Sequence, residues 1–193
     1  MAGWLKEFDS VCDFVFLTGP FESALPVTPI VEQFFPDDPK CQWFRKMEHL
    51  EEGGVRYAGL DVGFETIGKA LAEQGPFDGV LGFSQGAALS FYTAAKQQNG
   101  ELVPPDGGKL KFAIIIAGFT PRDLNHRYLF NSQLETPTCH IWGDHDVLKF
   151  KSEEATKNCV EPLVLNHKAG HKVPKLSQTQ VGLLSDFIHK AMQ

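Results

Sequence analysis

The 193-residue sequence lacks most features that mark membrane, secreted or nucleic-acid-binding proteins. No apolar run is long enough to cross a bilayer, and the first residues lack the charged-then-apolar order of a secretory signal. The four cysteines form no Cys-x-x-Cys pair, which favours reduced thiols in a cytoplasmic protein over disulfides. With 18 basic and 24 acidic residues the net charge is −6, which argues against a nucleic-acid partner.

Motifs for metals and nucleotide cofactors are also missing. No Gly-x-Gly-x-x-Gly follows an apolar run, and no Gly-x-x-x-x-Gly-Lys-Ser/Thr phosphate loop occurs. His167 and His171 have the spacing of two zinc ligands, but Gly170 lies between them and no third ligand accompanies them. We therefore expect no cofactor and no metal. A content of 42% hydrophobic and 22% charged residues fits one globular domain over residues 1–193.

The sequence does contain a Gly-x-Ser-x-Gly motif centred on Ser84. An apolar run precedes the motif, and residues 85–98 follow it with good helix propensity. This order predicts a strand, a sharp turn and a helix, with Ser84 at the turn. Glycine at Gly82 and Gly86 is expected to remove Cβ atoms that would clash. The backbone N–H of Gln85, at the start of the helix, is a candidate donor to an oxyanion. An ordinary glycine-rich turn is the alternative interpretation.

Apolar and amphipathic segments alternate along the chain. Strands are expected at the short apolar runs, and helices where apolar residues recur every three or four positions. The expected strands cover residues 12–17, 77–81, 111–117, 138–142 and 162–165, and the expected helices cover 65–73, 85–98 and 177–191. Because strands alternate with helices, the sequence predicts an α/β fold with a mostly parallel sheet flanked by helices in three layers.

One region, residues 24–57, departs from this alternation. It is rich in proline and contains the aromatic residues Phe34, Phe35, Trp43 and Phe44. Long loops in compact domains are often lids or binding loops, so these aromatics and Phe83, beside Ser84, are candidates for a substrate pocket. A surface segment whose aromatics cover the sheet is the alternative.

A serine hydroxyl is a poor nucleophile at neutral pH and needs an adjacent base. The chain has seven histidines, of which His171 is best placed, because it follows the strand-like run at 162–165 and precedes the last helix. His167 is a rival that lies nearer the strand. His49 and His189 are expected to be solvated.

An acid that orients the histidine should follow the run at 138–142, where the chain reads Gly-Asp-His-Asp. Asp144 and Asp146 both qualify, and the spacing from Gly143 favours Asp146. A turn with a capping aspartate is the alternative for this motif. The order serine, acid, histidine along the chain nevertheless matches an α/β-hydrolase site.

Several of these segments resemble the FSH-type serine hydrolases, a branch of the α/β-hydrolase superfamily. The elbow at 75–88 is the most specific likeness, and residues 14–22, 114–119, 140–146 and 170–174 are similar to other parts of that family. The resemblance implies an α/β-hydrolase fold, with Ser84 as nucleophile, Asp146 as acid and His171 as base. It also implies hydrolysis of small carboxylic ester or thioester substrates, without a cofactor or metal.

Members of the family usually begin with a strand that ends in a His-Gly loop, and this sequence has no such segment. Residues 1–8 resemble the end of the helix that follows it. The family's loop supplies a second oxyanion donor, and its strand lies beside the nucleophile strand. The absence is expected to expose strand edges or to close up the sheet. A catalytically weakened binding protein or a truncated fragment is therefore the alternative to an active hydrolase.

Overall fold

A four-stranded parallel sheet forms the centre of the computed structural model, which describes residues 2–23, 40–45, 47–50 and 54–193. The strands follow one another in space as they do in the chain: β5 (Gly79–Phe83), β6 (Phe112–Ile116), β7 (Thr138–Gly143) and β8 (Leu163–His167). All five residues of β6 are buried, as expected for an apolar strand covered on both faces. The predicted parallel sheet is thus confirmed.

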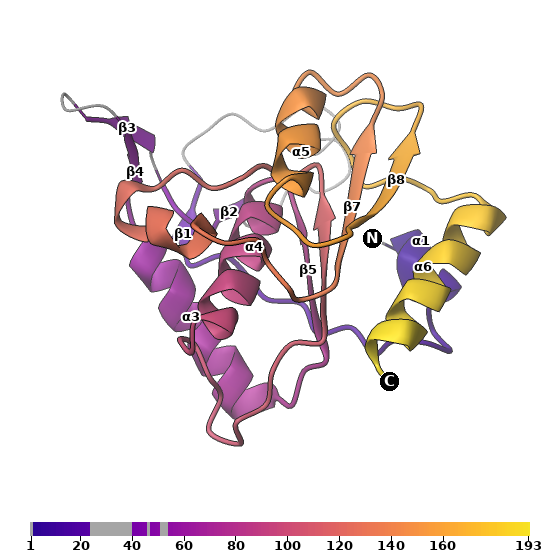
Figure 1. The fold of residues 1–193 in the computed structure, drawn as a ribbon, viewed down its shortest axis with the longest axis horizontal. Coiled ribbons are helices and arrows are strands. Elements are labelled where there is room, and N and C mark those ends of the chain that lie inside the picture. The colour runs from indigo at the N-terminus through magenta and orange to yellow at the C-terminus, as the bar shows by residue number, and fades with distance from the viewer. Residues whose placement is uncertain (1, 24–39, 46, 51–53) are drawn as a thin grey trace.

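Helices cover both faces of this sheet, which gives the three predicted layers. Figure 1 shows α3 and α4 on one side of the sheet and α1 and α6 on the other. Their bounds are α1 (Ala2–Glu7), α3 (Leu60–Gln74), α4 (Gln85–Gln98), α5 (Lys149–Thr156) and α6 (Gln178–Ala191), with a 3₁₀ helix η1 (Leu124–Phe130). Along β6, Ile115 packs into the α3–α4 side while Ile114 and Ile116 pack into the α6 side.

The strand predicted at residues 12–17 is wrong. These residues carry no regular secondary structure, and the side chains of Val15 and Phe16 are 50% and 56% exposed. An apolar run becomes a strand only when a neighbouring strand takes up its backbone hydrogen bonds. Within the described part of the chain, β5 pairs with β6 alone and is therefore an edge strand of the sheet.

The described part of the 24–57 region takes part in two small antiparallel pairs. In the first, β1 (Phe21–Glu22) pairs with β2 (Cys41–Gln42), and in the second β3 (Met47–His49) pairs with β4 (Val55–Tyr57).

His49 and His189 are exposed, as predicted. All four cysteines are free thiols, with Cys139 and Cys159 buried and Cys41 exposed. Among the described helices, none combines the length and apolar character needed to cross a bilayer.

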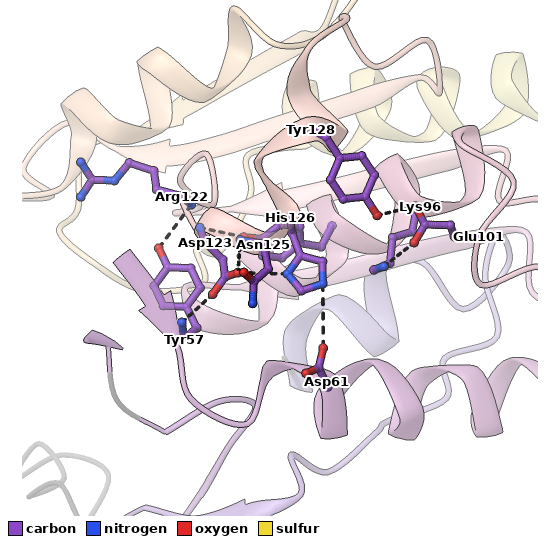
Figure 2. Close-up of polar contacts among 10 residues, drawn as sticks. Tyr57, Asp61, Lys96, Glu101, Arg122, Asp123, Asn125, His126 and Tyr128 are labelled. Atoms are coloured by element: carbon purple, nitrogen blue, oxygen red, sulfur yellow. Dashed lines mark hydrogen bonds and ion pairs between the residues drawn. The ribbon is translucent and has the colours of Figure 1, made fainter. Parts of the chain in front are cut away.

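One buried carboxylate, Asp123, joins η1 to β4 (Figure 2). Its Oδ2 accepts a hydrogen bond from the backbone N–H of Tyr57 at 2.6 Å, and its Oδ1 accepts one from Asn125 N–H at 3.0 Å. Oδ1 also lies 3.1 Å from Nδ1 of His126, whose ring packs edge-on against Phe64. Asp123 is only 2% exposed, so these donors depend on it rather than on water.

We expect Asp123→Ala to lower the free energy of unfolding by about 2–4 kcal/mol, because it leaves buried donors unpaired. Urea unfolding followed by circular dichroism measures the change. Asp106→Ala is the matched control: Asp106 also accepts a backbone N–H, from Gly108 at 2.9 Å, but in an exposed turn. Equal losses in the two variants would contradict a central role for Asp123.

A second buried polar group lies in the middle of the sheet. His140 on β7 is 0% exposed, and its Nε2 lies 3.4 Å from the Sγ of Cys159. Its Nδ1 has no hydrogen-bond partner among the described residues. Burial lowers the pKa of His140 from 6.5 to about 4, so the folded protein holds this ring neutral in mildly acidic solution.

The sign of this shift makes the fold acid-sensitive. The unfolded chain takes up a proton at His140 near pH 6.5 and the folded protein only near pH 4, so stability falls between these values. We expect His140→Leu to reduce the loss of unfolding free energy between pH 7 and pH 4 by about 3 kcal/mol. His189→Leu, at an exposed position in α6, is the control for the replacement of a histidine by leucine. Parallel curves for the wild type and His140→Leu would refute this account.

Candidate active site

Ser84 lies at a sharp elbow between β5 and α4. Its φ of 53° and ψ of −113° are strained for a residue other than glycine. The elbow is joined to the sheet because the Ser84 N–H donates to the carbonyl oxygen of Ile116, at the end of β6, at 2.9 Å. Helix α4 begins at the next residue, Gln85, and the N–H groups of its first turn have no acceptor within the helix. The positive end of the helix therefore faces the Ser84 hydroxyl.

The two glycines of the motif differ in what they allow. A Cβ on Gly82 would lie 2.1 Å from the carbonyl oxygen of Gly86, so the strand and the first turn of α4 can approach this closely only without it. A Cβ on Gly86 would lie 3.5 Å from Nε1 of Trp43, which is an ordinary contact. The clash expected at Gly82 is present, and the one expected at Gly86 is not.

The structure brings three of the predicted residues into one hydrogen-bonded chain. Nε2 of His171 lies 2.9 Å from Oγ of Ser84, across 87 positions of sequence. Nδ1 of the same ring lies 2.7 Å from Oδ2 of Asp146. The Asp146 side chain is fully buried, whereas the imidazole is about one third exposed. The imidazole also packs against the ring of Phe83, with centroids 5.0 Å apart.

Of the two candidate acids, only Asp146 contacts the histidine. Its second oxygen, Oδ1, accepts the backbone N–H of Leu148 at 2.8 Å, which holds the carboxylate in its turn. Asp144 is exposed and bonds instead to Lys149 at 3.2 Å and to Asn166 at 3.1 Å. The Lys149 ammonium beside it lowers the pKa of the Asp144 carboxyl group.

Backbone contacts join the loop that carries Asp146 to the loop that carries His171. A Cβ on Gly143 would lie 2.1 Å from the carbonyl oxygen of Ala169, and the N–H of Asp144 donates to the carbonyl oxygen of His167 at 2.7 Å. His167 itself ends β8, and its Nδ1 accepts the N–H of Ala169 at 3.2 Å. His171, not His167, is therefore the histidine beside Ser84. Nothing in the sequence alone indicated the close approach at Gly143.

The predicted pocket residues fall into two groups. Trp43 is half-buried against Gly86, and Phe44 is buried in the core, stacked on Tyr57 with ring centroids 4.7 Å apart. Phe34 and Phe35 lie outside the described residues.

Over residues 2–23, 40–45, 47–50 and 54–193, no group of three or more His, Cys, Asp or Glu residues is arranged to hold a metal ion.

A family model described as serine hydrolase (FSH1) matches residues 1–182. The chain belongs to this family. The family resemblance predicted from the sequence is therefore confirmed. Esterase C25G4.2 of Caenorhabditis elegans is 34% identical over 181 residues, which cover 90% of this chain and 77% of that protein. Esterase OVCA2 of Mus musculus is 34% identical over 177 residues, which cover 84% of this chain and 76% of that protein.

Solved structures share the fold of this FSH1 family member at low sequence identity. The crystal structure of SOBER1 from Arabidopsis thaliana superposes with a TM-score of 0.63 at 16% identity, covering 97% of this chain and 90% of that one. Acyl-protein thioesterase 2 from Zea mays gives a TM-score of 0.56 at 20% identity, with 83% and 77% covered. These likenesses confirm the predicted α/β-hydrolase fold.

The tight elbow leads to a stability prediction. We expect Gly82→Ala to lower the free energy of unfolding by at least about 1–3 kcal/mol, because the new Cβ must displace the first turn of α4. Gly182→Ala in α6, where a Cβ would meet nothing within 4 Å, should instead stabilise the protein by about 0.5–1 kcal/mol. Denaturant titration measures these changes, and a Gly82→Ala variant as stable as the wild type would show that the elbow relaxes freely.

Proposed function

We propose that this chain hydrolyses carboxylic esters or thioesters of small acyl substrates, with Ser84 as nucleophile, His171 as base and Asp146 as orienting acid. The observation that carries the proposal is the continuous contact from Ser84 Oγ through the imidazole to the buried Asp146. Membership of a serine hydrolase family and relatives named esterases support the same chemistry. No cofactor takes part in the proposed reaction.

In the proposed first step, Ser84 Oγ attacks the carbonyl carbon of the substrate while His171 Nε2 takes the hydroxyl proton. The Asp146 carboxylate accepts the N–H of Nδ1, which leaves Nε2 free to act as the base and stabilises the imidazolium. The imidazolium then protonates the departing alcohol or thiol, and an acyl-enzyme on Ser84 remains. Water attacks this acyl-enzyme with His171 again acting as base, and the acid and free Ser84 are released.

The developing negative charge on the carbonyl oxygen needs donors. We assign the backbone N–H of Gln85 as one of them, because it opens α4 directly after the nucleophile. The half-buried Trp43 beside Gly86 and the buried Phe44 next to it supply an apolar wall for the acyl group. Phe83, packed on His171, is assigned to hold the imidazole as well as to border this space.

Labelling with a fluorophosphonate probe tests the nucleophile. We expect covalent labelling of the wild type and none of Ser84→Ala, because the probe reacts only with an activated serine. His171→Ala should lose labelling as well, since no other base contacts Ser84 Oγ among the described residues. Labelling that persists in Ser84→Ala would overturn the assignment.

The two neighbouring aspartates provide a matched pair for the acid. Asp146→Asn should lower kcat for p-nitrophenyl acetate by up to about 10⁴-fold, because the amide no longer holds the required tautomer of His171. Asp144→Asn removes the same charge two positions away but touches only Lys149 and Asn166, and its kcat should stay within about twofold. Equal losses would contradict the assignment of Asp146.

A catalytically weakened binding protein is the second candidate, and the edge position of β5 is the observation behind it. In the resemblance described above, the loop that follows a strand beside the nucleophile strand supplies the second oxyanion donor, and removing one such donor typically costs about 10²–10³ in rate. Labelling of Ser84 without steady ester turnover would favour this candidate. Turnover of p-nitrophenyl esters that disappears in Ser84→Ala would exclude it.

A further inference from the structure

The side chain of Gln85 has an arrangement that the hydrolytic scheme does not use. Its Oε1 accepts the backbone N–H of Trp43 at 2.6 Å, and its Nε2 donates to the carbonyl oxygen of Phe44 at 2.7 Å. The amide thus pairs with the backbone as a neighbouring strand would, across more than 40 positions of sequence. The residue that follows the nucleophile is tied directly to the segment at 40–45.

The Trp43 ring lies beside the first turn of the helix that Gln85 begins. The indole Nε1 is 3.5 Å from the position that a Cβ on Gly86 would occupy, in the first turn of α4. On its other side the Trp43 carbonyl oxygen would be 2.9 Å from a Cβ on Gly63, so α3 also approaches this backbone closely. The Trp43 backbone therefore lies close to α3 and its indole close to α4, in the residue whose own N–H pairs with Gln85.

Other contacts also hold this segment in place, and Trp43 itself packs against the hydrophobic core. Phe44 is 5% exposed and stacks on Tyr57, and the N–H of Arg45 donates to the carbonyl oxygen of Ala58 at 2.8 Å. The segment should therefore remain attached to the protein when the Gln85 amide is lost. What the amide adds is the position of the Trp43 backbone and ring relative to Ser84.

We propose that the Gln85 side chain is a positioning residue that holds the Trp43 ring beside Ser84 as the wall of the acyl-binding space. This inference rests on the proposed ester hydrolysis and deepens it, because it makes Gln85 a determinant of acyl-chain preference. Long acyl groups reach the indole and gain from its apolar surface, whereas an acetyl group is too short to depend on it.

Gln85→Met tests the proposal, since methionine keeps the backbone N–H and the side-chain length but cannot form either hydrogen bond. For p-nitrophenyl octanoate we expect kcat/KM to fall about tenfold, mainly through KM, because a displaced indole no longer buries part of the acyl chain. The loss on p-nitrophenyl acetate should be smaller, so the ratio of octanoate to acetate kcat/KM should fall about fivefold or more. Equal losses on the two esters would overturn the proposal.

The same helix offers a matched control at its other end. Gln98 forms an equivalent pair, with Nε2 donating to the Gln133 carbonyl at 3.1 Å and Oε1 accepting the Glu135 N–H at 2.7 Å. Gln98→Met should leave the ratio of octanoate to acetate activity unchanged. A change as large as that of Gln85→Met would mean that the effect is general loosening of α4, and the proposal would fail.

A second measurement does not depend on activity. Of the three tryptophans, Trp4 and Trp142 are 2% and 6% exposed, so acrylamide quenching of fluorescence reports mainly on the half-buried Trp43. Quenching should increase in Gln85→Met, stay unchanged in Gln98→Met, and not respond to Gln85→Met when Trp43 is phenylalanine. Unchanged quenching in Gln85→Met would overturn the positioning role, whether or not the protein hydrolyses esters.

Two further variants keep the result interpretable. If Gln85→Met melts at a much lower temperature than Gln98→Met, Gln85→Glu takes its place. Its carboxylate still accepts the Trp43 N–H but cannot donate to Phe44, so its acrylamide quenching should lie between those of the wild type and Gln85→Met.

In a Trp43→Ala background, Gln85→Met should lower kcat/KM for p-nitrophenyl octanoate by less than about twofold. Additive losses would show that Gln85 acts without Trp43. A wild-type chain with no esterase activity would refute the proposed function alone.

Discussion

The close approach between β5 and the first turn of α4 is the constraint on which the site depends. Gly82 lies against the carbonyl oxygen of Gly86, and this contact forces Ser84 into a positive-φ conformation that serine rarely adopts. The strain persists because the Ser84 N–H is bonded to Ile116 on β6 and α4 is buried along most of its length. The packed sheet and helix thus hold the hydroxyl outward at the start of a helix.

The rest of the site follows from the parallel register of the sheet. Since β5 to β8 run in the same direction, the loops after β7 and β8 emerge at the edge where Ser84 lies. Gly143 lets these two loops touch, and the touching loops place Asp146 and His171 in line with Ser84. A rigid sheet therefore supplies the spacing, and short backbone contacts supply the final alignment.

The side of Ser84 away from β6 is built differently. There β5 has no strand partner among the described residues, and the segment at 40–45 reaches α4 through the Gln85 amide. Val15 and Phe16, in the apolar run that forms no strand, remain exposed. The cytoplasmic location, the lack of a nucleic-acid partner and the pocket roles of Phe34 and Phe35 stay predictions of the sequence.

Elements whose signals are local could be predicted from the sequence alone. Strands β5 to β8 and helices α4 and α6 lie where periodicity and the Gly-x-Ser-x-Gly motif predict them, because apolar patterning reflects burial directly. Other features depend on contacts between segments that are distant in the chain. An apolar run at 12–17 forms no strand without a partner, and Asp146 rather than Asp144 meets His171 because one side chain turns inward and the other reaches Lys149. Pairings such as Gln85 with Trp43 join residues distant in the chain, and no local pattern encodes such contacts.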